Sequence, residues 1–272
     1  MTDRRMFPHG PPSPTPVRRW RPLLLLAAAL VAGTAVLPPG IAAAAPLRSD
    51  SWESYGRGLG GGVTIVPGRS GLVEISGYDG ADLPAGSSLR LTAPAGARVT
   101  GTPLADTARF QGSVTADGAA GTYTYVRDSG PGSWKDGGYP FALAVDTRAV
   151  PGTRLPGCDV ELTDAGGTRR ASGRCTVTVG MPVPMLTEPA GGTFVSGAAR
   201  LAGTSYPGAR VSVVDAAERK VCAGVARVDG TWACTPDTPL PAGANRLHAS
   251  AAFNGVSAVG EDVDFTVTAR TA

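Results

Sequence analysis

Few residues in this sequence have types and spacing suited to catalysis. The chain holds two histidines, His9 and His248, and four cysteines. A Ser-His-Asp arrangement for acyl transfer needs a serine activated by a histidine, and the common turn motif for such a serine, Gly-x-Ser-x-Gly, does not occur. His248 alternates with Leu247 and Ala249 in a strand-like run, which predicts a solvent-facing side chain. The histidines therefore indicate no nucleophilic enzyme.

Carboxylates are the next candidates for chemistry. Glycoside hydrolysis needs only two carboxylates across a groove, so composition does not exclude it. Asp262 and Asp264 lie two residues apart on one strand face, but this spacing also suits a solvated edge. Asp79 and Asp82 could offer oxygens to calcium, yet the ligand spacing of an EF-hand is absent. Zinc would have too few ligands if the cysteines are oxidised. We predict no catalytic residue, no metal site and no cofactor.

The segment 127–140 holds the residues best suited to binding. It is rich in glycine and contains Trp134, Lys135, Asp136 and Tyr139. Aromatic side chains on a long polar loop can stack on sugars or anchor a protein partner. Alternatively, Trp134 folds back over the end of the domain and caps its core. We take these four residues as the candidate ligand-binding site.

The four cysteines predict disulfides that stabilise the fold. An even count in an exported chain favours oxidised pairs, and four cysteines allow three connectivities. Strand geometry favours the local pairs, Cys158 with Cys175 and Cys222 with Cys234. If Gly166-Gly167 form a two-residue turn, Cys158 lies opposite Cys175 at a non-hydrogen-bonded position, where the chains are close enough to bridge. Both side chains then face the core.

The second cysteine pair brackets the run 221–234, which we interpret as a stapled hairpin turning at Asp229-Gly230. A two-residue turn would leave the two cysteines on opposite faces. A three-residue loop of 228–230 restores one face but sets the cysteines on a diagonal of about 7–8 Å. We therefore expect a bulge or strand break near Ala223-Gly224.

The beginning of the chain predicts export. Arg18, Arg19 and Arg21 precede an uncharged, mostly apolar run at 23–37, followed by small residues at 42–45. This is the pattern of a secretory signal peptide, which we place at 1–44. A transmembrane anchor is the alternative, but the run is shorter than the roughly 20 residues that span a bilayer. We expect no membrane span after cleavage, and a secreted protein in the extracellular space or at the cell wall.

Charge argues against nucleic acid as a partner. Five of the 25 basic residues and one of the 22 acidic residues precede position 45, so the exported remainder is near neutral. Binding of nucleic acid needs a clustered basic face that neutralises phosphates.

Short strand-like runs separated by turn-forming residues continue from residue 63 to the end. Examples of the runs are 88–92, 141–145 and 210–215. No stretch sustains a helical period, so the pattern predicts antiparallel sandwiches. We expect an all-β fold of two tandem antiparallel β-sandwich, immunoglobulin-like domains after a cleaved signal peptide. The predicted boundaries are 45–62 for a flexible N-terminal segment, 63–180 for the first domain, 181–184 for a proline-rich linker and 185–269 for the second domain.

The second domain carries a family resemblance. Glu188-Pro-Ala-Gly-Gly192, Leu201-Ala-Gly-Thr204, Val228-Asp-Gly-Thr-Trp232 and Leu240-Pro-Ala-Gly-Ala-Asn245 follow in order. Residues 185–269 thereby resemble the bacterial immunoglobulin-like domains of secreted and surface proteins. The resemblance implies a seven-stranded sandwich used as a spacer, adhesion or ligand-presenting module, without fixed functional residues. The preceding domain carries no such signature.

We therefore predict a secreted, non-enzymatic binding, adhesion or spacer module acting at or outside the cell wall. Its partner is an unidentified protein or a cell-wall glycan. The alternative is a carbohydrate-active protein whose first domain binds or hydrolyses sugar and whose immunoglobulin-like domain is an accessory.

Overall fold

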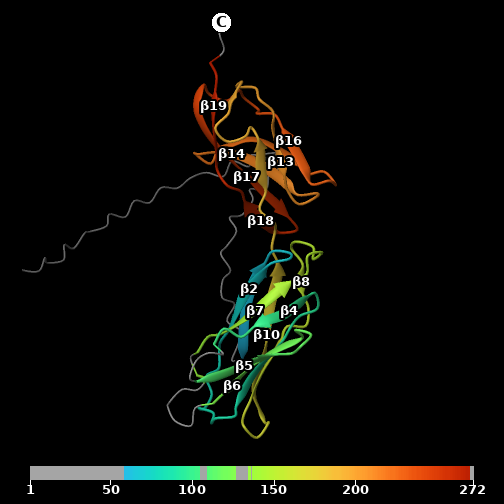
Figure 1. The fold of residues 1–272 in the computed structure, drawn as a ribbon, viewed down its shortest axis with the longest axis vertical. Helices are drawn as coiled ribbons and strands as arrows, with labels where there is room; N and C mark the ends of the chain where they lie inside the picture. The colour runs from blue at the N-terminus through green and yellow to red at the C-terminus, as the bar shows by residue number, and fades with distance from the viewer. Residues whose placement is uncertain (1–57, 105–108, 127–133, 136, 270–272) are drawn as a thin grey trace, which may run out of the picture. The chain divides into compact units, whose positions relative to one another are not determined.

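The described part of the chain is built entirely from strands and loops. The computed structural model describes residues 58–104, 109–126, 134–135 and 137–269 (Figure 1). The regular elements in these ranges are all β-strands, so the all-β sandwich prediction is confirmed. The strands surround two hydrophobic clusters, one drawn from residues 59–179 and one from 181–267. The domain boundaries stay predictions, and the signal peptide lies outside the described residues.

The first sandwich has two sheets. The larger sheet has the order β1-β10-β9-β3-β6-β5, with β8 also paired to β10, and the smaller sheet has the order β2-β7-β4. Alternation places Leu89 and Leu91 of β3, and Val160 and Leu162 of β9, in the core between the sheets. The strands are β1 (Leu59–Ile65), β2 (Ser70–Ile75), β3 (Ser88–Thr92), β4 (Ala97–Gly101), β5 (Phe110–Val114), β6 (Ala120–Tyr125), β7 (Tyr139–Val145), β8 (Arg154–Leu155), β9 (Asp159–Thr163) and β10 (Arg169–Val179).

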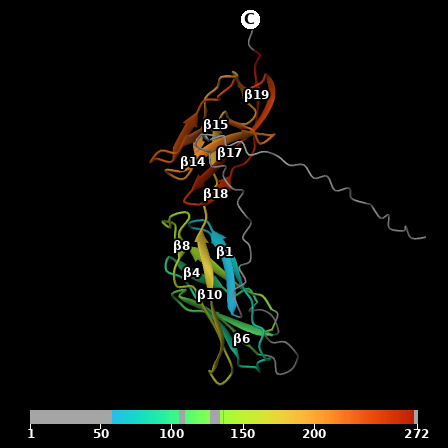
Figure 2. The ribbon, with the colours of Figure 1, turned by 180° about the vertical axis from the view of Figure 1, so that it is seen from behind.

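The glycine run at 60–62 lies inside β1, although the sequence placed it in a flexible segment ending at residue 62. β1 runs parallel to β10, with Leu59 opposite Gly173 (Figure 2). Glycine is required here because the backbones approach closely: a Cβ on Gly61 would collide with the carbonyl oxygen of Glu74, and one on Gly173 with that of Leu59. The glycines are therefore a packing requirement of the strand rather than a sign of flexibility.

The hairpin of β9 and β10 brings Cys158 and Cys175 together, as predicted, but by a different route. The turn is not two residues long, because Gly167 N–H donates to Asp164 O and Asp164 N–H donates to Thr168 O. A bulge at Arg170 then shifts the register by one residue and restores the predicted pairing. Cys175 N–H donates to Cys158 O, so the predicted non-hydrogen-bonded position is wrong.

The second sandwich has the two-sheet arrangement that the resemblance implied, but with nine strands instead of seven. One sheet has the order β11-β13-β16. It packs against a sheet of order β12-β19-β17-β14-β15, in which β18 also pairs with β17. β12 runs parallel to β19, while the other pairs are antiparallel. The strands are β11 (Met185–Glu188), β12 (Phe194–Val195), β13 (Leu201–Thr204), β14 (Arg210–Asp215), β15 (Lys220–Val225), β16 (Thr231–Cys234), β17 (Gly243–Phe253), β18 (Val256–Val259) and β19 (Val263–Val267).

The run 221–234 is not a hairpin, which corrects the sequence interpretation. β15 pairs with β14 in one sheet and β16 with β13 in the other, so the Asp229-Gly230 turn carries the chain between sheets. The disulfide between Cys222 and Cys234 joins the two sheets, with a Cα–Cα distance of 5.9 Å. Because the two strands are not paired, the diagonal distance within a hairpin does not apply. Ala223 and Gly224 pair in register with β14, and the irregularity of β15 lies at Val221, between Lys220 and Cys222.

The glycines of β1 give a test of the close backbone approach. Gly61→Ala should lower the free energy of unfolding by about 1–3 kcal/mol, because its methyl group has no space beside Glu74. Gly62→Ala is the matched control, since a Cβ there would lie 3.8 Å from Thr176 O and the position is exposed. Urea unfolding followed by circular dichroism measures both variants. Equal losses would show that the space around Gly61 does not matter.

Candidate functional site

The segment predicted to bind ligands places its tryptophan in the core of the first sandwich. Trp134 is 1% exposed, and its Nε1–H donates to Ser87 Oγ at 2.7 Å. Ser87 is itself completely buried. This is the alternative in which the indole caps the core. A buried indole N–H needs such a partner, because leaving it unsatisfied costs about 1–3 kcal/mol.

Of the other three predicted residues, the structure describes Lys135 and Tyr139, which differ in exposure. Lys135 is exposed, and Asp136 lies outside the described residues. Tyr139, the first residue of β7, is only 5% exposed. In this conformation neither Trp134 nor Tyr139 offers a free ring face on which a sugar could stack.

Trp134 and Tyr139 belong to an aromatic cluster at one end of the core. The Trp134 ring centroid lies 5.0 Å from those of Phe110 and Tyr139, and Tyr123 lies 4.9 Å from Phe141. The rings are tilted or edge-on, the geometries that aromatic pairs prefer. Burial raises the pKa of Tyr139 to about 12, with Arg109 opposing the shift. The cluster keeps its phenol groups protonated and contributes packing rather than reactivity.

The four cysteines form the two predicted disulfides. Cys158 bonds to Cys175 with a Cα–Cα distance of 5.1 Å, and Cys222 bonds to Cys234. None of the four is a free thiol. All four cysteines are therefore structural residues that stabilise the fold.

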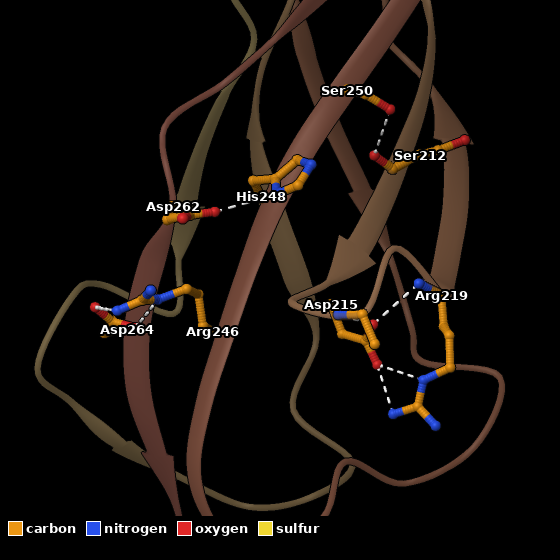
Figure 3. Close-up of polar contacts among 9 residues, drawn as sticks. Ser212, Asp215, Arg219, Arg246, His248, Ser250, Asp262 and Asp264 are labelled. Carbon is orange, nitrogen blue, oxygen red and sulfur yellow. Dashed lines mark hydrogen bonds and ion pairs between the residues drawn. The ribbon is translucent and has the colours of Figure 1, made fainter. Parts of the chain in front are cut away.

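Polar groups on the outer side of the second sandwich are paired with one another (Figure 3). His248 Nδ1 lies 3.1 Å from Asp262 Oδ1, and Arg246 binds both oxygens of Asp264 at 2.7 and 3.2 Å. The guanidinium of Arg246 lowers the pKa of Asp264. The Ser250 hydroxyl donates to the backbone oxygen of Ser212 rather than to the histidine. Asp264 is therefore engaged in an ion pair and Asp262 in a contact with the imidazole of His248, and the His248–Asp262 pair lacks the serine of a triad.

The described residues bring no metal site together. No three histidine, cysteine, aspartate or glutamate side chains gather there in positions to hold an ion. Likewise, no helix in these ranges has the length and apolar character to cross a membrane.

A broad polar surface, which the sequence prediction missed, covers the outer side of the larger sheet of the first sandwich. We call it the β3–β9 face. One row crosses five strands in register: Ser172 pairs with Glu161, Glu161 with Arg90, Arg90 with Thr122, and Thr122 with Ser113. The outward side chains of the face are those of Ser88, Arg90, Thr92, Gln111, Ser113, Thr122, Thr124, Asp159, Glu161, Thr163, Ser172 and Arg174.

A groove of about 390 Å³ lies on this face between β3, β9 and β10. Arg169 approaches Glu161, and Arg174 approaches Asp159, each at 3.7 Å and with both partners well exposed to solvent. Exposed ion pairs of this length contribute little to stability. Arg90 makes no ion pair within the described part of the chain. Its guanidinium therefore has the donors free to bind a carboxylate from outside.

The sequence signal for this face was present but ambiguous. Arg90 alternates with Leu89 and Leu91, as Glu161 does with Val160 and Leu162. Such alternation identifies a solvated strand face but does not show that the two strands are neighbours. Only the order of the strands in the folded sheet shows that β3 and β9 are neighbours.

Comparison with known proteins gives structural likenesses only. No family model and no curated protein matches the chain. A biofilm-associated protein BSP domain is 17% identical, covering 79% of this chain and 30% of its own, with a TM-score of 0.28. The third cohesin ScaC of Acetivibrio cellulolyticus, in complex with the ScaB dockerin, is 12% identical over 44% of this chain and 96% of its own, with a TM-score of 0.30. The Ig1-2 module of a Drosophila receptor protein tyrosine phosphatase is 11% identical, covering 79% and 97%, with a TM-score of 0.22.

Trp134 should be essential for stability. Trp134→Ala should lower the free energy of unfolding by about 3–5 kcal/mol, since it empties a large buried site. Ser87→Ala should cost about 1–3 kcal/mol by leaving the indole N–H unpaired. Lys135→Ala, an exposed neighbour, should change stability by less than about 0.5 kcal/mol. Urea unfolding monitored by circular dichroism distinguishes them. A Trp134→Ala protein as stable as the Lys135 control would contradict the core position.

Tyr139 should make the fold sensitive to alkali. An unfolded tyrosine ionises near pH 10, whereas Tyr139 in the fold ionises near 12. The folded state therefore holds the proton more tightly, and this contribution to stability is complete below pH 10 and declines as pH rises toward 12. Between pH 10 and 11 the loss should be about 1 kcal/mol. Urea unfolding at pH 9, 10 and 11 should show that the free energy of unfolding declines less in Tyr139→Phe than in the unaltered protein. Equal declines in the two proteins would show that Tyr139 does not cause the loss of stability at high pH.

Proposed function

We propose that this protein is a secreted, non-enzymatic binding module that acts at or outside the cell wall and docks a protein partner on the β3–β9 face. The observation that carries the proposal is the row from Ser172 through Glu161 and Arg90 to Ser113, which crosses five strands of one sheet. Two disulfides support an oxidising, extracellular setting.

The construction of the face suits protein recognition. Its side chains project from paired strands rather than loops, so their positions are held by the sheet and binding orders few groups. The face mixes both signs of charge with short hydroxyl side chains. Arg90 and Arg174 of the face, with Arg169 in its groove, supply planar guanidinium groups, and arginine is enriched at protein interfaces where lysine is depleted. The exposed ion pairs Arg169–Glu161 and Arg174–Asp159, each at 3.7 Å, can break and re-form with groups of a bound protein at little cost in free energy.

The carbohydrate-active alternative has less support. It drew on stacking by the aromatic residues of 127–140, and Trp134 and Tyr139 are buried. The carboxylates Asp262 and Asp264 are engaged by His248 and Arg246. A protein partner therefore fits the described surface better than a glycan does.

Charge reversal on the face tests this proposal. The partner is first captured by chemical cross-linking on cells that secrete the full-length chain, and its affinity for the purified protein is then measured by calorimetry. Arg90→Glu combined with Arg174→Glu should weaken binding at least tenfold, about 1.4 kcal/mol, because like charges across an interface repel. The matched control is Arg210→Glu, an exposed arginine on β14 of the second sandwich, which should leave the affinity within twofold.

Glycan arrays and peptidoglycan pull-downs with the same proteins provide the competing measurement. We expect no retention on either. Glycan binding that survives the double reversal would favour the carbohydrate alternative, and hydrolysis of any polysaccharide would refute a non-enzymatic role. An unchanged affinity of the double variant for the partner would show that the β3–β9 face is not the docking surface.

A further inference from the structure

The charges in the groove of the β3–β9 face do not balance. Three arginines and two carboxylates are among its lining residues, which leaves one positive charge in excess. Glu161 lies near Arg169, and Asp159 lies near Arg174, so each carboxylate has an arginine of β10 beside it. The excess charge is therefore carried by Arg90, the groove arginine that belongs to β3.

Arg90 has uncharged hydroxyl residues on three of its four sides. Thr122 of β6 lies opposite it on one side and Glu161 of β9 on the other. Ser88 and Thr92 are the next residues of β3 that point to the same face, because side chains alternate along a strand. A carboxylate that approaches from β6 therefore meets the exposed guanidinium without passing another acidic group of the strand pair.

The two acidic residues of the groove limit what can bind at Arg90. Asp159 and Glu161 are both exposed, and like charges held together across an interface repel. A ligand with a negative charge on every unit would be pressed against these carboxylates. A single acidic side chain can instead lie on the β6 side, where Thr122 and Ser113 are uncharged. The groove thus favours one carboxylate over a polyanion.

We propose that the protein partner of the β3–β9 face binds Arg90 through one aspartate or glutamate side chain placed at the boundary between β3 and β6. This inference rests on the proposed function and names the chemistry that the partner presents. The planar guanidinium fork matches a carboxylate in a bidentate pair, which is among the stronger hydrogen-bonded contacts of proteins. Paired strands on both sides hold the backbone of Arg90 in place.

Zero-length cross-linking tests this chemistry directly. Arg90→Lys puts a primary amine in the groove of a chain that otherwise has only Lys135 and Lys220. A carbodiimide activates a carboxylate, and an amine in contact with it then forms an amide while the carbodiimide leaves as a urea. On cells that secrete the full-length chain, mass spectrometry should map an amide between the introduced lysine and an aspartate or glutamate of another protein. Arg210→Lys, on the second sandwich, is the matched control and should give no link to that protein.

Calorimetry with the protein identified by this cross-link measures the contact. Arg90→Gln removes the charge but keeps a polar side chain, and it should weaken binding at least tenfold. Arg90→Lys keeps the charge and should weaken binding less than Arg90→Gln does. Conversion of the cross-linked carboxylate to its amide should cause the same loss, and it should cause no further loss when Arg90→Gln is already present. Arg210→Gln should leave the affinity within twofold.

The outcomes separate this inference from the proposed function. If Arg90→Glu with Arg174→Glu weakens the complex but Arg90→Gln leaves the affinity within twofold, the partner docks on the face without a carboxylate at Arg90, and the inference is wrong. Cross-links of the introduced lysine only to Glu161 or other carboxylates of its own chain, or to none, would also overturn it. An unchanged affinity in the double reversal would instead contradict the proposed function itself.

An acidic glycan is the competing ligand for the groove. Polygalacturonate, which carries a carboxylate on each sugar, is the probe, and calorimetry with the full-length chain should detect no binding that depends on Arg90. Binding of polygalacturonate that Arg90→Gln weakens at least tenfold would assign the groove to a polyanionic glycan and would overturn the inference.

Discussion

The close approach of β1 to β10 is the constraint on which the first sandwich depends. β1 pairs with β10 along its whole length and bridges the end of β2 through Gly60 and Ser76, so it connects the two sheets. No side chain fits at Gly173, where β10 meets Leu59 of β1, or at Gly61, where β1 meets Glu74 of β2. The disulfide at Cys175 then ties β10 to the start of β9. The β3–β9 face includes residues of β10, so its geometry rests on this contact.

Much of the strand content follows from local patterns. The expected strands at 88–92 and 210–215 match β3 and β14 because alternation of apolar and polar residues is strong there. The first half of β1, residues 59–62, falls in the predicted flexible segment because its glycines look like a linker. Their role depends on Gly173 and Glu74, which are distant in sequence, and no local pattern reveals such a contact. The short strands β8 and β12 have two residues each and produce no periodic signal.

The cysteine pairs show how a correct pairing can be reached through an incorrect turn. For Cys158 and Cys175, a longer turn and a bulge at Arg170 cancel in register, so the prediction of the pair was right and its bonding position was wrong. For Cys222 and Cys234, proximity in sequence suggested a hairpin, whereas the chain crosses between sheets.

The candidate site was harder to predict than the strands. The sequence left two orientations of Trp134 open, and the decision depends on Ser87, a hydrogen-bond partner 47 residues away that no spacing identifies. The β3–β9 face depends equally on sheet order. Arg90 and Glu161 become neighbours only because β3 pairs with β9, and a solvated face on either strand alone is unremarkable.

The parallel pairing of terminal strands has a mechanical consequence. β1 opens the first sandwich and β10 closes it, and the two strands run in the same direction. A pulling force applied to the two ends of this sandwich is therefore directed along the strands in opposite senses, and it loads the whole ladder in shear instead of opening one hydrogen bond after another. In the second sandwich β12 also runs parallel to β19, over two residue pairs, but β11 precedes it and pairs with β13. A first sandwich held between two anchors would resist extension first through the β1–β10 ladder.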